Sequence, residues 1–206
     1  MANLITLLRM PVLAITIALF YTTSAPARYV GAALIPVLIA MDSLDGIVAR
    51  RRGESSVLGS VLDIAADRTV EMLLWVVFAH LRLIPIVIPL LVLARGVFVD
   101  ALRAVAPSRG LTPFDLMRSP LGRFLVKSPW LRTPYALVKG LAFFTLALTH
   151  GMLLGDASAL AVVAPIAGIT SWLALGLCLA RGIPVLIEGS RTLTESDGAG
   201  ETEEVR

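Results

Sequence analysis

The sequence has a single cysteine, Cys178, among its 206 residues. One cysteine excludes an internal disulfide and a cysteine-ligated metal cluster, so we interpret Cys178 as a small buried hydrophobic residue. Histidine is nearly as scarce, with only His80 and His150. Neither is adjacent to a serine or cysteine, and both fall at predicted outer ends of helices. We therefore expect interfacial histidines and no histidine-activated serine or cysteine nucleophile.

Charged residues are also few, at 16% of the chain, whereas 57% of the residues are hydrophobic. That apolar content exceeds what a soluble domain of this length needs for its core. A helix needs roughly 20 apolar residues to cross about 30 Å of hydrocarbon, and no alternating pattern indicates a barrel. We predict an all-α integral membrane protein with six transmembrane helices. Their approximate ranges are 3–24, 29–49, 57–81, 83–104, 135–153 and 157–182.

Basic residues gather on one side of the predicted membrane. An arginine run at 50–52 follows the second helix, and most other basic residues lie between the fourth and fifth helices or after the sixth. The opposite loops hold only Arg28 and Arg82. This bias predicts that both termini are cytoplasmic. We divide the chain into a transmembrane domain, 1–190, and a disordered acidic cytoplasmic tail, 191–206.

The segment 105–134, between the fourth and fifth predicted helices, differs from the rest of the chain. Several prolines break it, and apolar side chains alternate there with cations. Such a segment is expected to lie along the cytoplasmic interface, where it can touch lipid headgroups.

Four aspartates lie inside the second and third predicted helices, near the loop that joins them. Asp42 and Asp45 are three residues apart. Asp63 and Asp67 are four apart, so each pair projects from one helix face, and a tight antiparallel hairpin would bring the four carboxylates together. Ionisable groups in spanning segments are costly unless they are paired, solvated or bound to cations. Oxygen ligands without nearby His or Cys favour Mg²⁺ or Mn²⁺, and we expect two such ions.

Small residues accompany these acids. Gly46 and Ala49 follow the first pair, and Gly59 precedes the second, which leaves room for a ligand against the backbone. Arg50 could bind phosphate oxygens. The alternative is that arginines neutralise the acids without any metal, although buried ion pairs gain little stability and do not explain the glycines. The arginines in that alternative are Arg50, Arg51, Arg52 and Arg68.

These residues form one string, Asp42-x2-Asp45-Gly46-x2-Ala49-Arg50-x8-Gly59-x3-Asp63-x3-Asp67. The string resembles the signature of the CDP-alcohol phosphatidyltransferases. Near the N-terminus, Asn3, Thr6, Arg9 and Pro11 look like the opening pattern of the same family.

The resemblance implies a role for each matching residue. Asp42, Asp45 and Asp63 would bind metal. Asp67 would lie beside the metal as a further ligand and act as general base toward the incoming hydroxyl. The residues implied to line the CDP-lipid site are Asn3, Thr6, Gly46, Ala49, Arg50 and Gly59.

The resemblance also implies the reaction and the partners. A phosphatidyl group would pass from CDP-diacylglycerol to a small alcohol or phosphoalcohol, with release of CMP. The expected surroundings are membrane lipids of a bacterial cytoplasmic membrane, with the active site facing the cytoplasm. Members of this family are commonly homodimers, and we expect no nucleic-acid partner.

The prediction of the acceptor alcohol rests on Arg95 and Arg103, which are eight residues apart on the fourth predicted helix. They resemble an Arg-x7-Arg stretch of phosphatidylglycerophosphate synthases, which use glycerol 3-phosphate, although Arg103 could simply mark the helix end. Two features depart from those enzymes: Gly96 stands where Glu is frequent, and their Gly-Lys-x-Lys-Thr element is missing. Inositol phosphate or a phosphatidyl lipid therefore stays open as the acceptor. A hypothesis of another class is a small transporter or a non-catalytic membrane scaffold, since carboxylates within a six-helix chain would suit a cation carrier.

Overall fold

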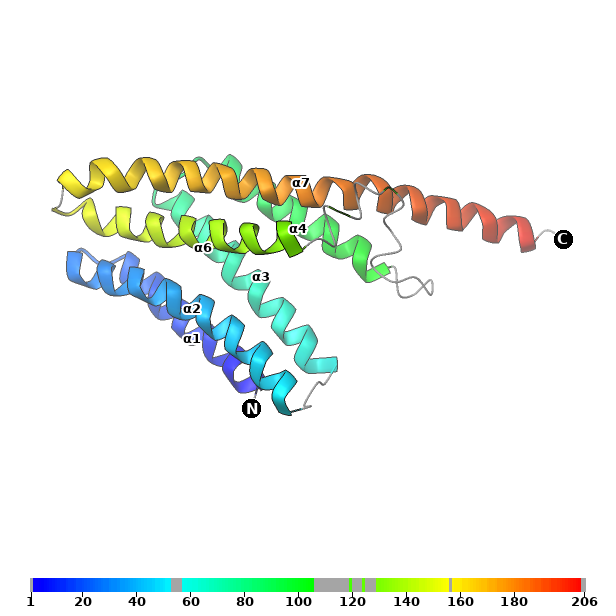
Figure 1. The fold of residues 1–206 in the computed structure, drawn as a ribbon, viewed down its shortest axis with the longest axis horizontal. Coiled ribbons are helices and arrows are strands. Elements are labelled where there is room, and N and C mark those ends of the chain that lie inside the picture. Colours follow the sequence, from blue (N-terminus) through cyan, green and yellow to red (C-terminus); the bar gives the residue numbers. More distant parts are fainter. Residues whose placement is uncertain are drawn as a thin grey trace. The chain divides into compact units, whose positions relative to one another are not determined.

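The computed structural model describes residues 2–52, 57–105, 119, 124, 129–155 and 157–204 (Figure 1). Side chains are described over 7–42, 59, 61–105, 119, 124, 133–155 and 158–192. The described chain forms six helices and no strand, which confirms the all-α prediction. The helices are α1 (Ala2–Phe20), α2 (Ala25–Arg52), α3 (Val57–His80), α4 (Val87–Val105), α6 (Pro129–Met152) and α7 (Ala157–Glu204).

Each predicted spanning segment coincides with one observed helix, and the largest differences are at the two C-terminal helices. Helix α6 begins at Pro129, inside the proline-broken segment, because a proline at the first helical position lacks only an N–H that would be unpaired there. Helix α7 continues to Glu204, through most of the tail, 191–206, for which the composition predicts disorder. No proline follows Pro184, so every residue of α7 after it retains a backbone N–H donor for helical hydrogen bonding.

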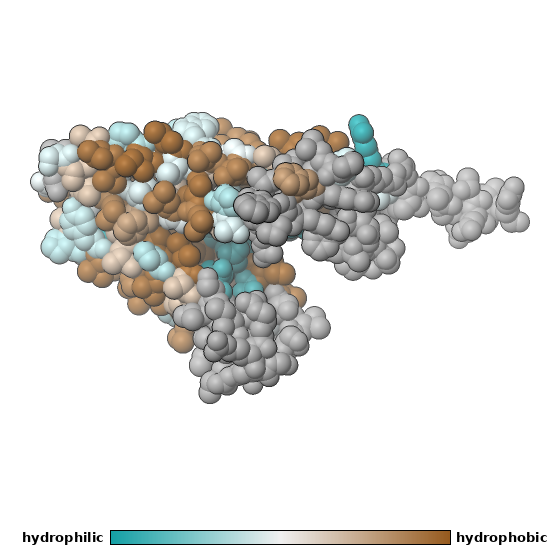
Figure 2. Space-filling model, viewed as in Figure 1, coloured by the Kyte–Doolittle hydropathy of each residue, from teal (hydrophilic) through white to brown (hydrophobic). Residues whose placement is uncertain are grey.

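Three segments of the described helices are long and apolar enough to cross a membrane: Ala25–Asp42, Thr133–Met152 and Ser158–Thr192. Large hydrophobic side chains are also exposed on the helices, among them Ile169 at 68% exposure. Figure 2 shows such apolar side chains spread over much of the described surface on one face. Exposed apolar surface on this scale is unfavourable in water and is what a lipid-facing protein requires.

The chain divides into two compact units, of which the first comprises Met1–Pro89 and Val138–Trp172. An aromatic cluster forms part of its core. The ring centroids of Trp75 and Phe143 are 4.7 Å apart, those of Phe78 and Phe143 are 6.1 Å apart, and those of Phe20 and Phe78 are 5.7 Å apart. Because these rings come from α1, α3 and α6, the cluster joins three helices that are distant in the sequence.

Helices α1 and α2 form a hairpin around a four-residue turn, and α1 packs against both α2 and α3. Gly31 allows the close approach of α1 and α2, because a Cβ atom there would lie 2.8 Å from the Phe20 ring. A larger residue at Gly31 would therefore push α1 and α2 apart near their turn.

Two side chains satisfy backbone carbonyls at the turn end of this unit. Arg28 donates from Nε to the carbonyl of Thr22 at 2.9 Å and from Nη1 to that of His150 at 3.3 Å. His150 is buried, and its Nε2 lies 2.8 Å from the carbonyl oxygen of Phe20. Carbonyls at helix C-termini lack intrahelical donors, so these contacts replace the missing ones. His150 is thus a buried structural residue rather than the interfacial one expected, whereas His80 is exposed.

Helix α3 ends in a Schellman motif. The amide of Leu83 donates to the carbonyl of Phe78, and the amide of Arg82 donates to that of Ala79, both at 3.0 Å. Arg82 occupies the left-handed position of the motif with φ of 59°, where glycine is preferred because a Cβ atom is strained.

The second unit comprises Leu90–Leu137 and Leu173–Arg206. Within it, Glu188 on α7 accepts two hydrogen bonds from Ser119, one from the amide at 2.9 Å and one from the hydroxyl at 2.5 Å. This pair of bonds attaches the connection before α6 to α7.

Candidate active site

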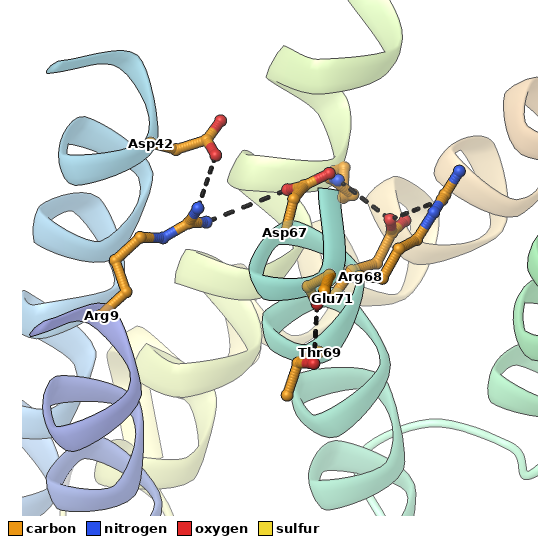
Figure 3. A network of polar contacts seen from close by, with 8 residues as sticks. Arg9, Asp42, Asp67, Arg68, Thr69 and Glu71 are labelled. Carbon is orange, nitrogen blue, oxygen red and sulfur yellow. Dashed lines mark hydrogen bonds and ion pairs between the residues drawn. The ribbon is translucent and has the colours of Figure 1, made fainter. Parts of the chain in front are cut away.

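A buried arginine lies between two of the predicted acids. Arg9 on α1 is only 2% exposed, and its Nη1 donates to Oδ1 of Asp42 on α2 at 2.6 Å. Its Nη2 is 3.9 Å from Oδ1 of Asp67 on α3. Figure 3 shows the guanidinium between the two carboxylates. Because α1 packs against both α2 and α3, one α1 side chain reaches an acid on each.

The two carboxylates remain accessible although their shared partner is buried. The side chains of Asp42 and Asp67 are 42% and 45% exposed. Part of each side chain is therefore accessible to a ligand other than Arg9. The hairpin predicted from the sequence brings four carboxylates together, and the structure places two of them, Asp42 and Asp67, against the same Arg9 guanidinium.

A second group of charges follows one turn further along α3. Glu71 is 3% exposed, and its Oε2 is 3.3 Å from Nζ of Lys139 on α6 and 3.5 Å from Nη1 of Arg68. Neither Glu71 nor Lys139 belongs to the site predicted from the sequence. The signal was present, because Glu71 follows Asp67 by four residues and so shares its helix face, and because both residues are ionisable within predicted spans.

The predicted metal ligands are only partly described. Asp63 lies four residues before Asp67 on α3, with its Oδ1 buried. The side chain of Asp45 lies outside the described residues. Among the residues that are described, no group of three or more His, Cys, Asp or Glu is placed to hold a metal ion. What is present fits a hard cation in part, since the donors are carboxylate oxygens and two of them already share one positive charge.

The residues expected to line a CDP-lipid site mostly fall outside the described side chains. Asn3 and Thr6 lie on α1, and Gly46, Ala49 and Arg50 lie on α2, but only their helical backbone is described. Gly59 lies on α3 and is half-buried.

The two arginines expected to bind an acceptor phosphate are on α4, in the second unit. Arg95 packs so closely on α7 that a Cβ atom at Gly182 would lie 2.5 Å from its Cγ and Nε atoms. The Nε atom is buried without a hydrogen-bond partner among the described residues. Arg103 lies in the last turn of α4. The neighbour of Gly182, Arg181, places its guanidinium 5.8 Å from the centroid of the Tyr135 ring, and the sequence analysis gave it no binding role.

Comparison with known proteins agrees with the signature. Two curated relatives, both named probable phosphatidylglycerophosphate synthase, come from Mycobacterium tuberculosis strains CDC 1551/Oshkosh and H37Rv. Each is 31% identical to this chain over 116 residues, which cover 55% of the chain and 56% of the relative. The match thus spans little more than half the length of these relatives. A family model for CDP-alcohol phosphatidyltransferases matches residues 1–180, and the chain belongs to that family.

Proposed function

We propose that this protein transfers the phosphatidyl group of CDP-diacylglycerol to glycerol 3-phosphate, giving phosphatidylglycerophosphate and CMP. The observation that carries the proposal is the convergence of Asp42 and Asp67, on two different helices, toward one buried positive charge. Both belong to the signature of a family that is known to use divalent metal ions. An acid pair that is partly exposed and held together suits the binding of a cationic cofactor at a phosphoryl centre.

In this proposal the acids have distinct tasks. Asp42, Asp45 and Asp63, with Asp67 beside them, would hold Mg²⁺ or Mn²⁺, which when bound withdraws charge from the pyrophosphate. Asp67 accepts the proton of the acceptor hydroxyl. The hydroxyl oxygen forms a bond to the lipid-bearing phosphorus, and the bond from that phosphorus to the oxygen of CMP breaks. No enzyme-bound covalent intermediate is required.

The nucleotide and the acceptor need separate contacts. We assign the CDP moiety to the small and polar residues of the signature and the N-terminal pattern, because glycine and alanine leave room for a ligand and a guanidinium matches phosphate oxygens. These residues are Asn3, Thr6, Gly46, Ala49, Arg50 and Gly59.

For the acceptor phosphate we assign Arg95 and Arg103. The buried Nε of Arg95, with no hydrogen-bond partner among the described residues, supports an anionic ligand there, since a buried guanidinium nitrogen is costly to leave unpaired. The names of the two mycobacterial relatives support glycerol 3-phosphate over inositol phosphate or a phosphatidyl lipid as the acceptor.

We further propose that all six helices span a bacterial cytoplasmic membrane, that both termini and the active site face the cytoplasm, and that the protein is a homodimer. The three long apolar segments and the exposed apolar surface support a membrane location. The orientation rests on the excess of arginine and lysine in the loops assigned to the cytoplasm.

The test is release of CMP from CDP-diacylglycerol by the purified protein, with Mg²⁺ or Mn²⁺ and each candidate acceptor in turn. We expect release only with metal present and fastest with glycerol 3-phosphate. Faster release with inositol phosphate or with a phosphatidyl lipid would identify that compound as the acceptor in place of glycerol 3-phosphate, and the proposed transfer reaction would be unchanged. No release with any acceptor would contradict the proposal.

A further inference from the structure

The charge arrangement around Arg9 makes this residue dependent on the acids it contacts. A guanidinium keeps its charge in proteins, and a buried charge is costly unless it is paired and hydrogen-bonded. Asp42 and Asp67 are the acidic partners of Arg9 among the described residues. The short contact to Asp42, 2.6 Å, is a charge-assisted hydrogen bond.

The same carboxylates depend on Arg9 in return. Two negative side chains on neighbouring helices repel each other when they face the same point. The Arg9 guanidinium offsets part of that repulsion, and the positive charge of Lys139 also acts on Asp67. Arg9 therefore does in this structure what the metal would do in the proposed reaction, which is to supply positive charge between Asp42 and Asp67.

We propose that Arg9 is a built-in counter-ion that competes with the divalent cation for the carboxylates of Asp42 and Asp67. This inference rests on the metal dependence contained in the proposed function. Arg9 holds the acids in place while the metal site is unfilled, and it weakens metal affinity because its charge repels a second cation at the same oxygens. Arg9 is thus a positioning residue rather than a catalytic one.

A purely structural role predicts a different outcome. If Arg9 only ties α1 to its neighbours, its loss lowers stability by the same amount with and without metal. If Arg9 competes with the metal, its loss lowers the stability mainly of the metal-free protein, and added metal restores the stability that the substitution removes. The two roles therefore differ in how stability and metal affinity are linked.

The experiment compares Arg9→Met with the unsubstituted protein, both full length and in detergent. Mn²⁺ binding is measured by calorimetry, and thermal unfolding is followed without metal and with saturating Mn²⁺. We expect Arg9→Met to bind Mn²⁺ at least about fivefold more tightly, which is less than the roughly 30-fold effect of one unit charge on a divalent ion about 4 Å away at the dielectric constant of water. The rise in unfolding temperature caused by Mn²⁺ should also be larger than in the unsubstituted protein.

Arg28→Met is the matched control. Arg28 is an arginine of the same unit whose described partners are the backbone carbonyls of Thr22 and His150. Its substitution should lower the unfolding temperature equally in both conditions and leave Mn²⁺ affinity unchanged. Unchanged or weaker Mn²⁺ binding by Arg9→Met would overturn the proposal.

Two further outcomes are decisive. If Arg9→Met aggregates when it is extracted without metal, extraction in Mn²⁺ should yield folded protein, and failure in both conditions would overturn the competing role. If the unsubstituted protein does not bind Mn²⁺ at all, the metal dependence of the proposed function is wrong, and this inference is wrong with it.

Discussion

The carboxylate of Glu71 lies 3.3 Å from the ammonium group of Lys139, so a charge pair joins α3 to α6 at a point where Glu71 is almost fully buried. Arg68 contacts the same carboxylate at 3.5 Å. Glu71 follows Asp67 by one helical turn, and the pair therefore fixes the part of α3 that carries the proposed general base.

We expect Glu71→Gln to lower the free energy of unfolding by roughly 3 kcal/mol, because it breaks a buried ion pair. Adding Lys139→Met should recover part of the loss by removing the ammonium group that the first change deprives of the Glu71 carboxylate. Denaturation in detergent measures both effects. Thr69→Ala, at an exposed position on α3, is the control and should change stability by less than about 0.5 kcal/mol. A loss for Glu71→Gln no larger than that of the control would show that the pair contributes nothing.

A second prediction concerns Gly182, which leaves space for Arg95. Gly182→Ala should displace the Arg95 side chain and cost about 1–3 kcal/mol of stability, because the new Cβ atom would meet the middle of that side chain. If Arg95 binds the acceptor phosphate, the KM for the alcohol should rise more than the KM for the lipid. Kinetics with each substrate varied separately would distinguish the two.

The control for this change is Gly176→Ala, also on α7, where a Cβ atom would meet nothing within 4 Å. It should leave KM unchanged and should stabilise the helix by up to about 1 kcal/mol, as Ala does in place of Gly. The single substitution Arg95→Ala, with Gly182 unchanged, should also raise the KM for the alcohol. If Arg95→Ala leaves that KM as it was, Arg95 does not contact the acceptor.

The third prediction separates the roles of the two acids that contact Arg9. Asp67→Asn keeps the shape of the side chain but removes the base, so turnover should fall by about 100-fold or more while the protein stays folded. Asp42→Ala should instead abolish Mn²⁺ binding measured by calorimetry. Substantial turnover by Asp67→Asn would exclude the role of general base, and Mn²⁺ affinity unchanged by Asp42→Ala would exclude the role of ligand.

The fourth prediction follows from the positive φ of Arg82. Arg82→Gly should raise the free energy of unfolding by up to about 1 kcal/mol, since glycine adopts this conformation without the strain of a Cβ atom. Thermal unfolding in detergent measures the change. Arg82→Ala removes the same charge but keeps the Cβ atom, so an equal gain there would assign the effect to the charge and not to the backbone.

The positions of the helices could be predicted from sequence because apolar run length alone determines them. The six ranges coincide with helices whose ends differ by a few residues, apart from the two at the C-terminal side. Helix α7 runs on to Glu204 although its composition becomes polar after residue 191. A polar composition indicates that a segment is exposed to solvent, but polar residues can still form the backbone hydrogen bonds of a helix.

The acids of the candidate site could also be recognised, but their partner could not. The spacing of Asp63 and Asp67 identifies one helix face from local sequence alone. The pairing of Asp42 with Arg9 depends on how α1 packs across two other helices, and 33 residues separate the two partners. The same limit applies to Lys139, which reaches Glu71 only because α6 returns beside α3.

The tight packing of Phe20 on Gly31 has a mechanical consequence for the Arg9–Asp42 contact. It fixes the first two helices at their connected end, whereas Asp42 lies about 16 Å further along α2, at a rise of roughly 1.5 Å per residue. Because Asp42 is far from this contact, a change of a few degrees in the angle between α1 and α2 at Gly31 would move Asp42 by about an ångström relative to Arg9.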